Sequence, residues 1–223
     1  MIGWMYLDYQ YMFDLTKQEA LALQKLSTPG KIQDFLDVLP MNGEEDGDTC
    51  HSPRWVLREN RAHCIEGALL AALALYLHGE KPLLLDLKTK QTDQEHVVAL
   101  FRKHGYWGAL SKTNHAVLRY RDPVYKTIRE LALSYFHEYF LIKNGDKTML
   151  SFSRPFSLEL YDHEWMTSEE NLFGLAADLD DSPHFDIVPS MNRRLLRKAS
   201  LVERTAASIP EWQGGKRMTH APK

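Results

Sequence analysis

One cysteine of this chain stands where a thiol can act as a nucleophile. Cys64 directly precedes an apolar run rich in Ala and Leu, residues 68–77, which predicts a buried helix of about four turns that begins near the cysteine. The first turn of a helix presents unpaired N–H groups and the positive end of the helix dipole, and both stabilise a thiolate. The run is too short to cross a bilayer, which takes roughly 20 residues.

A histidine further along the chain can serve as the general base for this thiol. His96 opens an alternating run at 96–102 that predicts a strand, and a turn at 103–105 leads into a second predicted strand at 106–111. A cysteine at a helix start and a histidine at the start of a hairpin strand form a candidate nucleophile and base. The plain alternatives are a buried cysteine that acts as a small hydrophobe and a histidine with a structural role alone.

The elements around this pair predict an α+β fold. A helix is expected to start at Asp122-Pro123, because Asp is favoured as N-cap and Pro at the first helical position. Helices are expected at 16–26, 31–39, 53–59, 64–77, 122–143 and in a short stretch capped by residues 168–170, and strands at 81–87, 96–102, 106–111, 116–121 and between 148 and 160.

This order of elements indicates a single α+β domain over residues 1–223. Its expected parts are a helical N-terminal layer at 1–53, a core at 54–160, C-terminal helices at 161–213 and a frayed tail at 214–223. The aromatic-rich residues 4–13 are expected to form a strand or a packed arm.

Composition bounds the classes of function. The chain has 223 residues, of which 44% are hydrophobic, enough for one core, and its net charge of −3 gives no sign of nucleic-acid binding. Two cysteines exclude a disulfide scaffold, and without a basic, apolar leader we expect a cytoplasmic protein with no membrane partner.

Nine acidic residues lie in 159–186 and eight basic ones in 191–223. This pattern predicts an acidic surface and a basic tail, or a tail that docks on that surface or on an acidic partner.

The region 55–118 resembles the core of the transglutaminase-like branch of the papain-like superfamily. The run from His96 to Phe101, and then Trp107 to Ser111, is similar to the family's His-Ala-Trp-Val-Glu-Val segment, turn and Trp-Val-x-Leu-Asp segment. The resemblance implies a cysteine helix packed on a central antiparallel sheet, with Cys64 as nucleophile and His96 as base. It also implies acyl transfer or hydrolysis at a peptide, amide or isopeptide carbonyl through a thioester, on a protein or peptide substrate and without a cofactor or metal.

The third member of the catalytic set departs from the family pattern. Ser111 stands where the family has an Asp that orients the imidazole, and a serine can accept a hydrogen bond but brings no charge. Asn114 is the next candidate, and Asp122 is a more distant one. This departure leaves open a non-catalytic interaction module that keeps the fold.

Residues near the cysteine can complete a site. Trp55 and Asn60 are candidates for a pocket wall or an oxyanion donor, with a packing Trp and a helix C-cap Asn as the structural alternatives. His63 is a candidate for substrate binding, and in its protonated form it would lower the pKa of the neighbouring thiol. A zinc site of Cys50-His51 and His63-Cys64 is disfavoured, because adjacent residues do not easily reach one ion.

Overall fold

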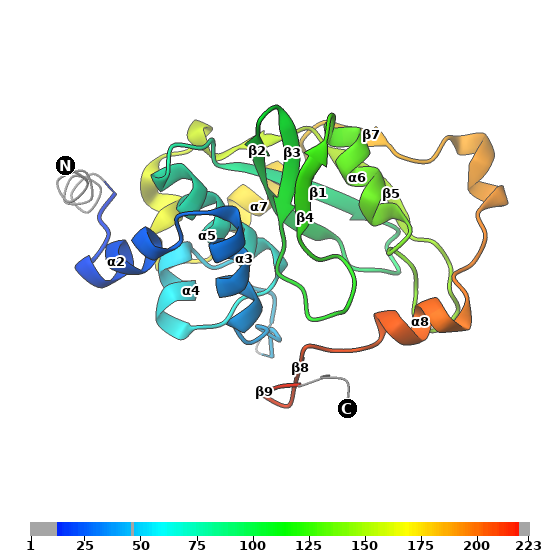
Figure 1. Ribbon diagram of the computed structural model, residues 1–223, viewed down its shortest axis with the longest axis horizontal. Coiled ribbons are helices and arrows are strands. Elements are labelled where there is room, and N and C mark those ends of the chain that lie inside the picture. The colour runs from blue at the N-terminus through cyan, green and yellow to red at the C-terminus, as the bar shows by residue number, and fades with distance from the viewer. Residues whose placement is uncertain (1–12, 46, 219–223) are drawn as a thin grey trace.

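The computed structural model describes residues 13–45 and 47–218. Helices gather on one side of a central sheet and helix α6 lies on the other side (Figure 1). The strand or arm expected at residues 4–13 falls, except for Phe13, outside the described residues.

The N-terminal layer consists of three helices that lead to the cysteine helix. They are α2 (Lys17–Lys25), α3 (Pro29–Val38) and α4 (Pro53–Glu59), and each begins where a side chain caps the first turn, at Thr16, Thr28 and Ser52. Helix α5 (Cys64–Leu77) follows. It is apolar on every side, and nearly all of it is buried between the other helices and the sheet.

The sheet is antiparallel throughout, which confirms the α+β fold. In the described part of the chain it has seven strands in the order β4-β3-β2-β1-β5-β7, and β6 also pairs with β1. The strands are β1 (Leu83–Thr89), β2 (His96–Lys103), β3 (Tyr106–Leu110), β4 (Arg121–Tyr125), β5 (Met149–Ser153), β6 (Phe156–Ser157) and β7 (His184–Asp186).

The two faces of the sheet bury alternate side chains of the same strands. Val97, Ala99 and Phe101 of β2 share a cluster with α5, whereas Val98 and Leu100 share one with α6 (Ile128–Phe136). This alternation is the period of two that a strand imposes. With both faces covered, β2 is buried at its start and delivers His96 to one end of the sheet.

The fourth strand and the helix after it are displaced from their predicted places. The prediction of a strand at 116–121 and a helix from Asp122 is wrong, because residues 121–125 form the edge strand β4. An edge strand tolerates Pro123, since its missing N–H breaks no ladder on the open side. The helix begins instead at Ile128, where Thr127 and Glu130 form a capping box, and ends at Phe136 rather than near 143.

The C-terminal third is less helical than predicted. It contains the 3₁₀ turns η1 (Leu158–Leu160), η2 (His163–Met166) and η3 (Ser190–Leu195), helices α7 (Phe173–Asp180) and α8 (Leu201–Ala207), and a small hairpin of β8 (Trp212–Gln213) and β9 (Lys216–Arg217). Residues 168–170 do not cap a helix directly, because the Ser168 hydroxyl accepts from the N–H of Glu170 in a local turn, and the short helix that follows them is α7, which begins at Phe173. Gly214 and Gly215 turn the hairpin with positive φ, so the tail is ordered to residue 218.

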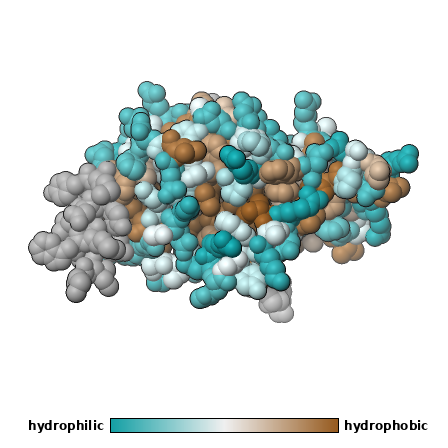
Figure 2. Space-filling model, turned by 90° about the horizontal axis from the view of Figure 1, so that it is seen from above, coloured by the Kyte–Doolittle hydropathy of each residue, from teal (hydrophilic) through white to brown (hydrophobic). Residues whose placement is uncertain are grey.

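Among the described residues, one ion pair joins the basic C-terminal segment to the acidic segment, and it lies near the start of the basic segment. Arg193 pairs with Asp186, but Lys198 pairs with Asp146, and Arg204 donates to the carbonyl of Ile142. Figure 2 shows one face of the molecule as hydrophilic side chains with smaller hydrophobic areas between them. Within the described residues, no helix has the length and apolarity that a membrane crossing requires.

Candidate active site

The cysteine helix begins at the reactive residue itself. Cys64 is the first residue of α5 and His63 is its N-cap, so the thiol stands at the end of the helix where backbone N–H groups have no helical partner. Gly67 lies one turn further on, and a Cβ there would come within 2.5 Å of the Cβ of Lys112. The glycine therefore lets the segment after β3 lie directly against the cysteine helix.

A small cavity of about 170 Å³ is lined by both Cys64 and His96. It lies where α5 and β2 begin and β3 ends, and Tyr139, Phe140 and Ala207 line its other side. Pockets for drug-sized ligands typically measure about 300–1,000 Å³. The cavity thus admits one small acyl group or side chain, not a large ligand.

The hydrogen bonds of His96 define its tautomer. Its Nε2 lies 2.7 Å from the Ser111 hydroxyl, and that hydroxyl also bonds the carbonyl oxygen of Leu118. Because a carbonyl can only accept, the Ser111 hydroxyl donates to Leu118 and accepts from the Nε2–H of His96. In the neutral ring this leaves the lone pair on Nδ1. His96 therefore has the form that a general base needs.

The carbonyl that fixes Ser111 belongs to a residue in an unusual backbone conformation. Leu118 has φ of 60°, in the left-handed region that residues with a Cβ rarely adopt. Its N–H donates to Glu138 at 2.6 Å, and the other carboxylate oxygen of Glu138 lies 2.7 Å from Arg121. Both polar backbone groups of Leu118 are therefore held, one by Glu138 and one by Ser111.

The two cysteines differ strongly in acidity. Burial opposes ionisation of Cys64, but hydrogen bonds to His63 and His96 outweigh it and lower the pKa of the thiol to about 5. For Cys50, burial and the negative charge of Glu66 raise the pKa to about 12. The surroundings thus favour the thiolate at Cys64 and the neutral thiol at Cys50.

A second imidazole lies at the same sulfur. The Nδ1 of His63 is 3.9 Å from the Cys64 sulfur, and its Nε2 donates to the Thr49 carbonyl at 2.9 Å. Glu66 is fully buried, and its Oε1 lies 3.4 Å from that Nε2. Burial favours a neutral His63, but contacts with Cys64 and Glu66 prevail and raise its pKa to about 11.

Glu66 is held as a carboxylate by a shell of donors. Burial raises its pKa, but hydrogen bonds from His63 and then Asn42 outweigh this and lower the value to about 2. It accepts hydrogen bonds from the Asn42 amide, the Thr49 hydroxyl and the backbone N–H groups of His51 and His63. The His63 ring and the buried Glu66 carboxylate therefore lie together beside the thiol, and each favours the charged form of the other.

No family model matches this chain, and a search of curated proteins finds no match. The chemistry of the site therefore follows from its own geometry, in which one thiol lies near two imidazoles. Ser111 and not a carboxylate binds the far nitrogen of His96. Of the two imidazoles at the thiol, His63 is the one with carboxylates near its ring, since Glu66 lies 3.4 Å and Glu44 lies 3.6 Å from its Nε2.

Asn114 and Asp122 do not bind His96. The side-chain amide of Asn114 lines the cavity, but it donates to the Trp212 carbonyl at 3.0 Å and accepts from the Trp212 N–H at 2.7 Å. Asn114 thus fastens the C-terminal hairpin to the wall of the site. Asp122 lies exposed in the edge strand β4.

Trp55 and Asn60 are not among the residues that line the cavity. The Trp55 ring stacks on His51 with 3.7 Å between ring centroids, and the Arg61 guanidinium lies 5.2 Å from its centre. Asn60 is the C-cap of α4 with φ of 54°, which is the structural alternative for this residue. The structure therefore gives neither side chain a place next to the sulfur.

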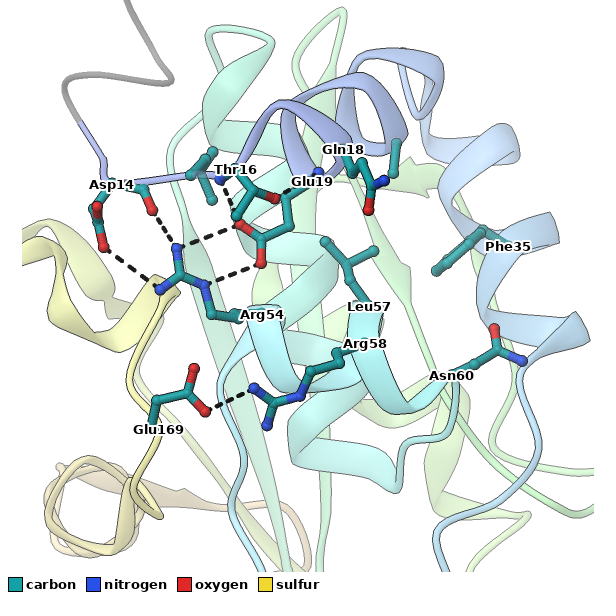
Figure 3. A pocket seen from close by; sticks show the side chains of 12 residues that line it. Asp14, Thr16, Gln18, Glu19, Phe35, Arg54, Leu57, Arg58, Asn60 and Glu169 are labelled. Carbon is teal, nitrogen blue, oxygen red and sulfur yellow. Dashed lines mark hydrogen bonds and ion pairs between the residues drawn. The ribbon is translucent and has the colours of Figure 1, made fainter.

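Asn60 instead lines a larger pocket of about 710 Å³ (Figure 3). There the Arg54 guanidinium bonds Asp14 and Glu19, and Arg58 pairs with Glu169 at 2.8 Å. Each arginine is already paired with a carboxylate. Volume alone therefore does not mark this pocket as the reactive one.

Three carboxylates come together away from the thiol. Asp86, Glu95 and Asp180 offer oxygens within 4.8 Å of one another, the one such group of three metal-binding side chains in residues 13–45 and 47–218. The Lys88 ammonium is 2.7 Å from Asp180, and the His184 Nε2 is 3.1 Å from Asp86. These partners already offset part of the negative charge, and we assign no metal here. The four residues of the zinc hypothesis do not form such a group.

Sequence reasoning missed Glu66 and Leu118 as parts of the site. Glu66 follows His63 at the spacing of a capping box, with His in place of the usual Ser or Thr, and this spacing was the available signal. No sequence pattern indicates the role of the Leu118 carbonyl, because its position depends on residues 111–120, a segment without regular secondary structure.

Proposed function

We propose that this protein is a cysteine-dependent acyltransferase or hydrolase that acts on a peptide, amide or isopeptide carbonyl through a thioester of Cys64. The observation that carries the proposal is the Cys64 thiol, with its pKa lowered to about 5, in one cavity with His96, whose Nε2 is bound to Ser111 and whose Nδ1 is left for the sulfur or the acyl acceptor. The transglutaminase-like resemblance supports it. The cysteine starts a buried helix, the histidine starts a strand, and the orienting residue directly follows the next strand.

The first half of the reaction forms the thioester. The Cys64 thiolate bonds to the carbonyl carbon, the carbon–nitrogen bond breaks, and the departing amine takes one proton. That proton is the one the thiol lost, and an imidazole beside the sulfur has held it since. The N–H groups in the first turn of α5 have no helical partner and are the donors available to stabilise the developing oxyanion.

The second half releases the acyl group. The Nδ1 of His96 accepts a proton from water or from an amine acceptor, whose oxygen or nitrogen then bonds to the carbonyl carbon. The carbon–sulfur bond breaks, the sulfur leaves as a thiolate, and the proton on His96 passes by way of the sulfur or solvent back to the imidazole that balances the thiolate at rest. The substrate enters as a single small group, because the cavity holds only about 170 Å³. A side chain or a chain end fits this volume.

The test is thiol labelling at pH 6, followed by mass spectrometry of each cysteine peptide. Cys64 should react with iodoacetamide far faster than Cys50, because only Cys64 is ionised at that pH. Cys50 is the internal control within the same molecule. A panel of acyl donors, namely glutamine peptides, amides and isopeptides, should then load Cys64 as a thioester, and Cys64→Ala should abolish the loading.

Equal labelling of the two cysteines at pH 6 would overturn the proposal. Selective alkylation without loading by any donor would instead favour an interaction module that has kept the fold. His96→Gln should stop turnover while a thioester accumulates, because general-base assistance typically contributes about 10²–10⁴-fold.

A further inference from the structure

Two imidazoles lie at the Cys64 sulfur, and their surroundings differ in charge. His63 has the buried Glu66 carboxylate 3.4 Å from its Nε2 and Glu44 at 3.6 Å. His96 has only the neutral hydroxyl of Ser111 at its far nitrogen. An imidazolium is stabilised by a nearby carboxylate and gains little from a neutral acceptor.

Resting on the proposed function, we propose that His63, backed by Glu66, is the counter-ion of the Cys64 thiolate, and that His96 serves the acyl acceptor. One proton moves from the sulfur to the Nδ1 of His63, and the departing amine later takes this proton. His63 is then a catalytic residue, because it contacts the reacting sulfur. Glu66 is a positioning residue that acts through His63.

This division of roles explains the serine at position 111. In a site with one histidine, a carboxylate behind the base stabilises the imidazolium that accompanies the thiolate. Here that carboxylate is Glu66, and it stands behind the other ring. The bond from His96 to Ser111 has only to fix the tautomer, and a hydroxyl held by the Leu118 carbonyl does so.

The competing candidate for the positive charge is His96, which also lowers the pKa of the Cys64 thiol. Burial raises the pKa of Cys50 and of Tyr139, and it lowers the pKa of His51, so these three groups are uncharged at neutral pH. The titratable groups that face His63 and Cys64 are Glu44, Cys50, His51, Glu66, His96 and Tyr139.

The deciding experiment compares His63→Gln with His96→Gln in the rate of Cys64 alkylation by iodoacetamide between pH 4 and 9. The side-chain amide that His63→Gln introduces can still donate to the Thr49 carbonyl, but it cannot carry a charge. In the parent protein the rate should be half-maximal near pH 5. His63→Gln should raise this midpoint by about two units, which slows labelling about tenfold at pH 6 and leaves it equal at pH 9. His96→Gln should move the midpoint less.

A second measurement uses the unmodified protein and so does not depend on how a variant folds. The ring nitrogen shifts of His63 in NMR spectra should show an imidazolium at pH 8. Cys64→Ala should lower the pKa of this ring, because thiolate and imidazolium stabilise each other. A neutral His63 ring at pH 7 in the parent protein would refute the inference.

Glu66→Gln tests whether Glu66 affects the pKa of the Cys64 thiol through His63 or directly through its own charge. Loss of a negative charge near the sulfur would by itself lower the thiol pKa, whereas loss of support for His63 raises it, and we expect the rise. A larger midpoint shift in His96→Gln than in His63→Gln overturns the inference and leaves the proposed function standing. An unreactive Cys64 in the parent protein at pH 6 overturns the proposed function itself.

Discussion

The Ser111 hydroxyl lies 2.7 Å from the Nε2 of His96 and receives its hydrogen, because its own hydrogen goes to the carbonyl of Leu118. A neutral side chain thus fixes the tautomer of the base. It holds the ring through geometry and adds no charge. This relationship ties the irregular segment 111–120 to the chemistry at Cys64.

Ser111→Ala should reduce both turnover and stability. The Nε2–H of His96 and the carbonyl of Leu118 lose their shared partner, and an unsatisfied buried group typically costs about 1–3 kcal/mol. Turnover should fall because the neutral ring is no longer held in one tautomer. Ser153→Ala is the matched control, since Ser153 is also buried but accepts from the N–H of Asp86. It should lower the urea midpoint without slowing turnover.

Glu66 should make the fold sensitive to acid. Its pKa is lowered from 4.5 to about 2, so its stabilising effect is complete above pH 4.5 and disappears as the pH falls through the folded value. We expect Glu66→Gln to lose on the order of 3 kcal/mol at pH 7, and to approach the parent protein near pH 2. Urea unfolding at pH 7, 4 and 2.5 measures this.

Glu203→Gln is the control for Glu66, because Glu203 forms a capping box with Ser200 at the surface. Solvent screens its carboxylate, so its substitution should change the unfolding midpoint far less. Equal losses for the two variants at pH 7 would contradict the role of buried charge.

Tyr139→Phe should leave stability unchanged or raise it. The Tyr139 hydroxyl is buried and has no hydrogen-bond partner among the described residues, so its removal relieves an unsatisfied group that costs about 1–3 kcal/mol. Tyr135→Phe is the matched control, since the equally buried Tyr135 hydroxyl donates to the Arg119 carbonyl at 3.1 Å. It should be destabilising by about 1 kcal/mol. Thermal unfolding measures the difference, and only Tyr135→Phe should lower the melting temperature.

Asn114→Ala should loosen the C-terminal hairpin. Both hydrogen bonds between the Asn114 amide and Trp212 are lost, so protease cleavage around residues 208–218 should be faster. Asn144→Ala removes a similar amide whose bonds stay within its own turn, to Asp146. It should not expose the hairpin, and equal cleavage of both variants would show that Asn114 is not the fastening point.

Local signals in the sequence predicted the cysteine helix and the hairpin that carries His96. The apolar run after Cys64 and the alternation from His96 each describe a single element, and α5, β2 and β3 follow them closely. Asp122-Pro123 is a helix-start signal on its own, but these residues lie in an edge strand, where Pro is tolerated, and the sequence does not show where the sheet ends.

The sequence does not predict the parts of the site that depend on contacts between residues far apart in the chain. Glu66 contacts Asn42 and Thr49, which come from a loop with no regular pattern. The carbonyl of Leu118 reaches Ser111 only because Glu138, from beyond α6, holds the backbone of Leu118 in the left-handed region. No local spacing in the sequence predicts a contact of this kind.

The pairing of Asn114 with Trp212 has a consequence for synthesis of the protein. The ribosome makes Cys64, His96 and Ser111 long before it makes Trp212, which fastens the segment just after Ser111. The cysteine helix and the sheet can form on the growing chain, but the wall of the cavity gains its last support about a hundred residues later. A nascent chain that stops short of Trp212 therefore carries the thiol without the finished site.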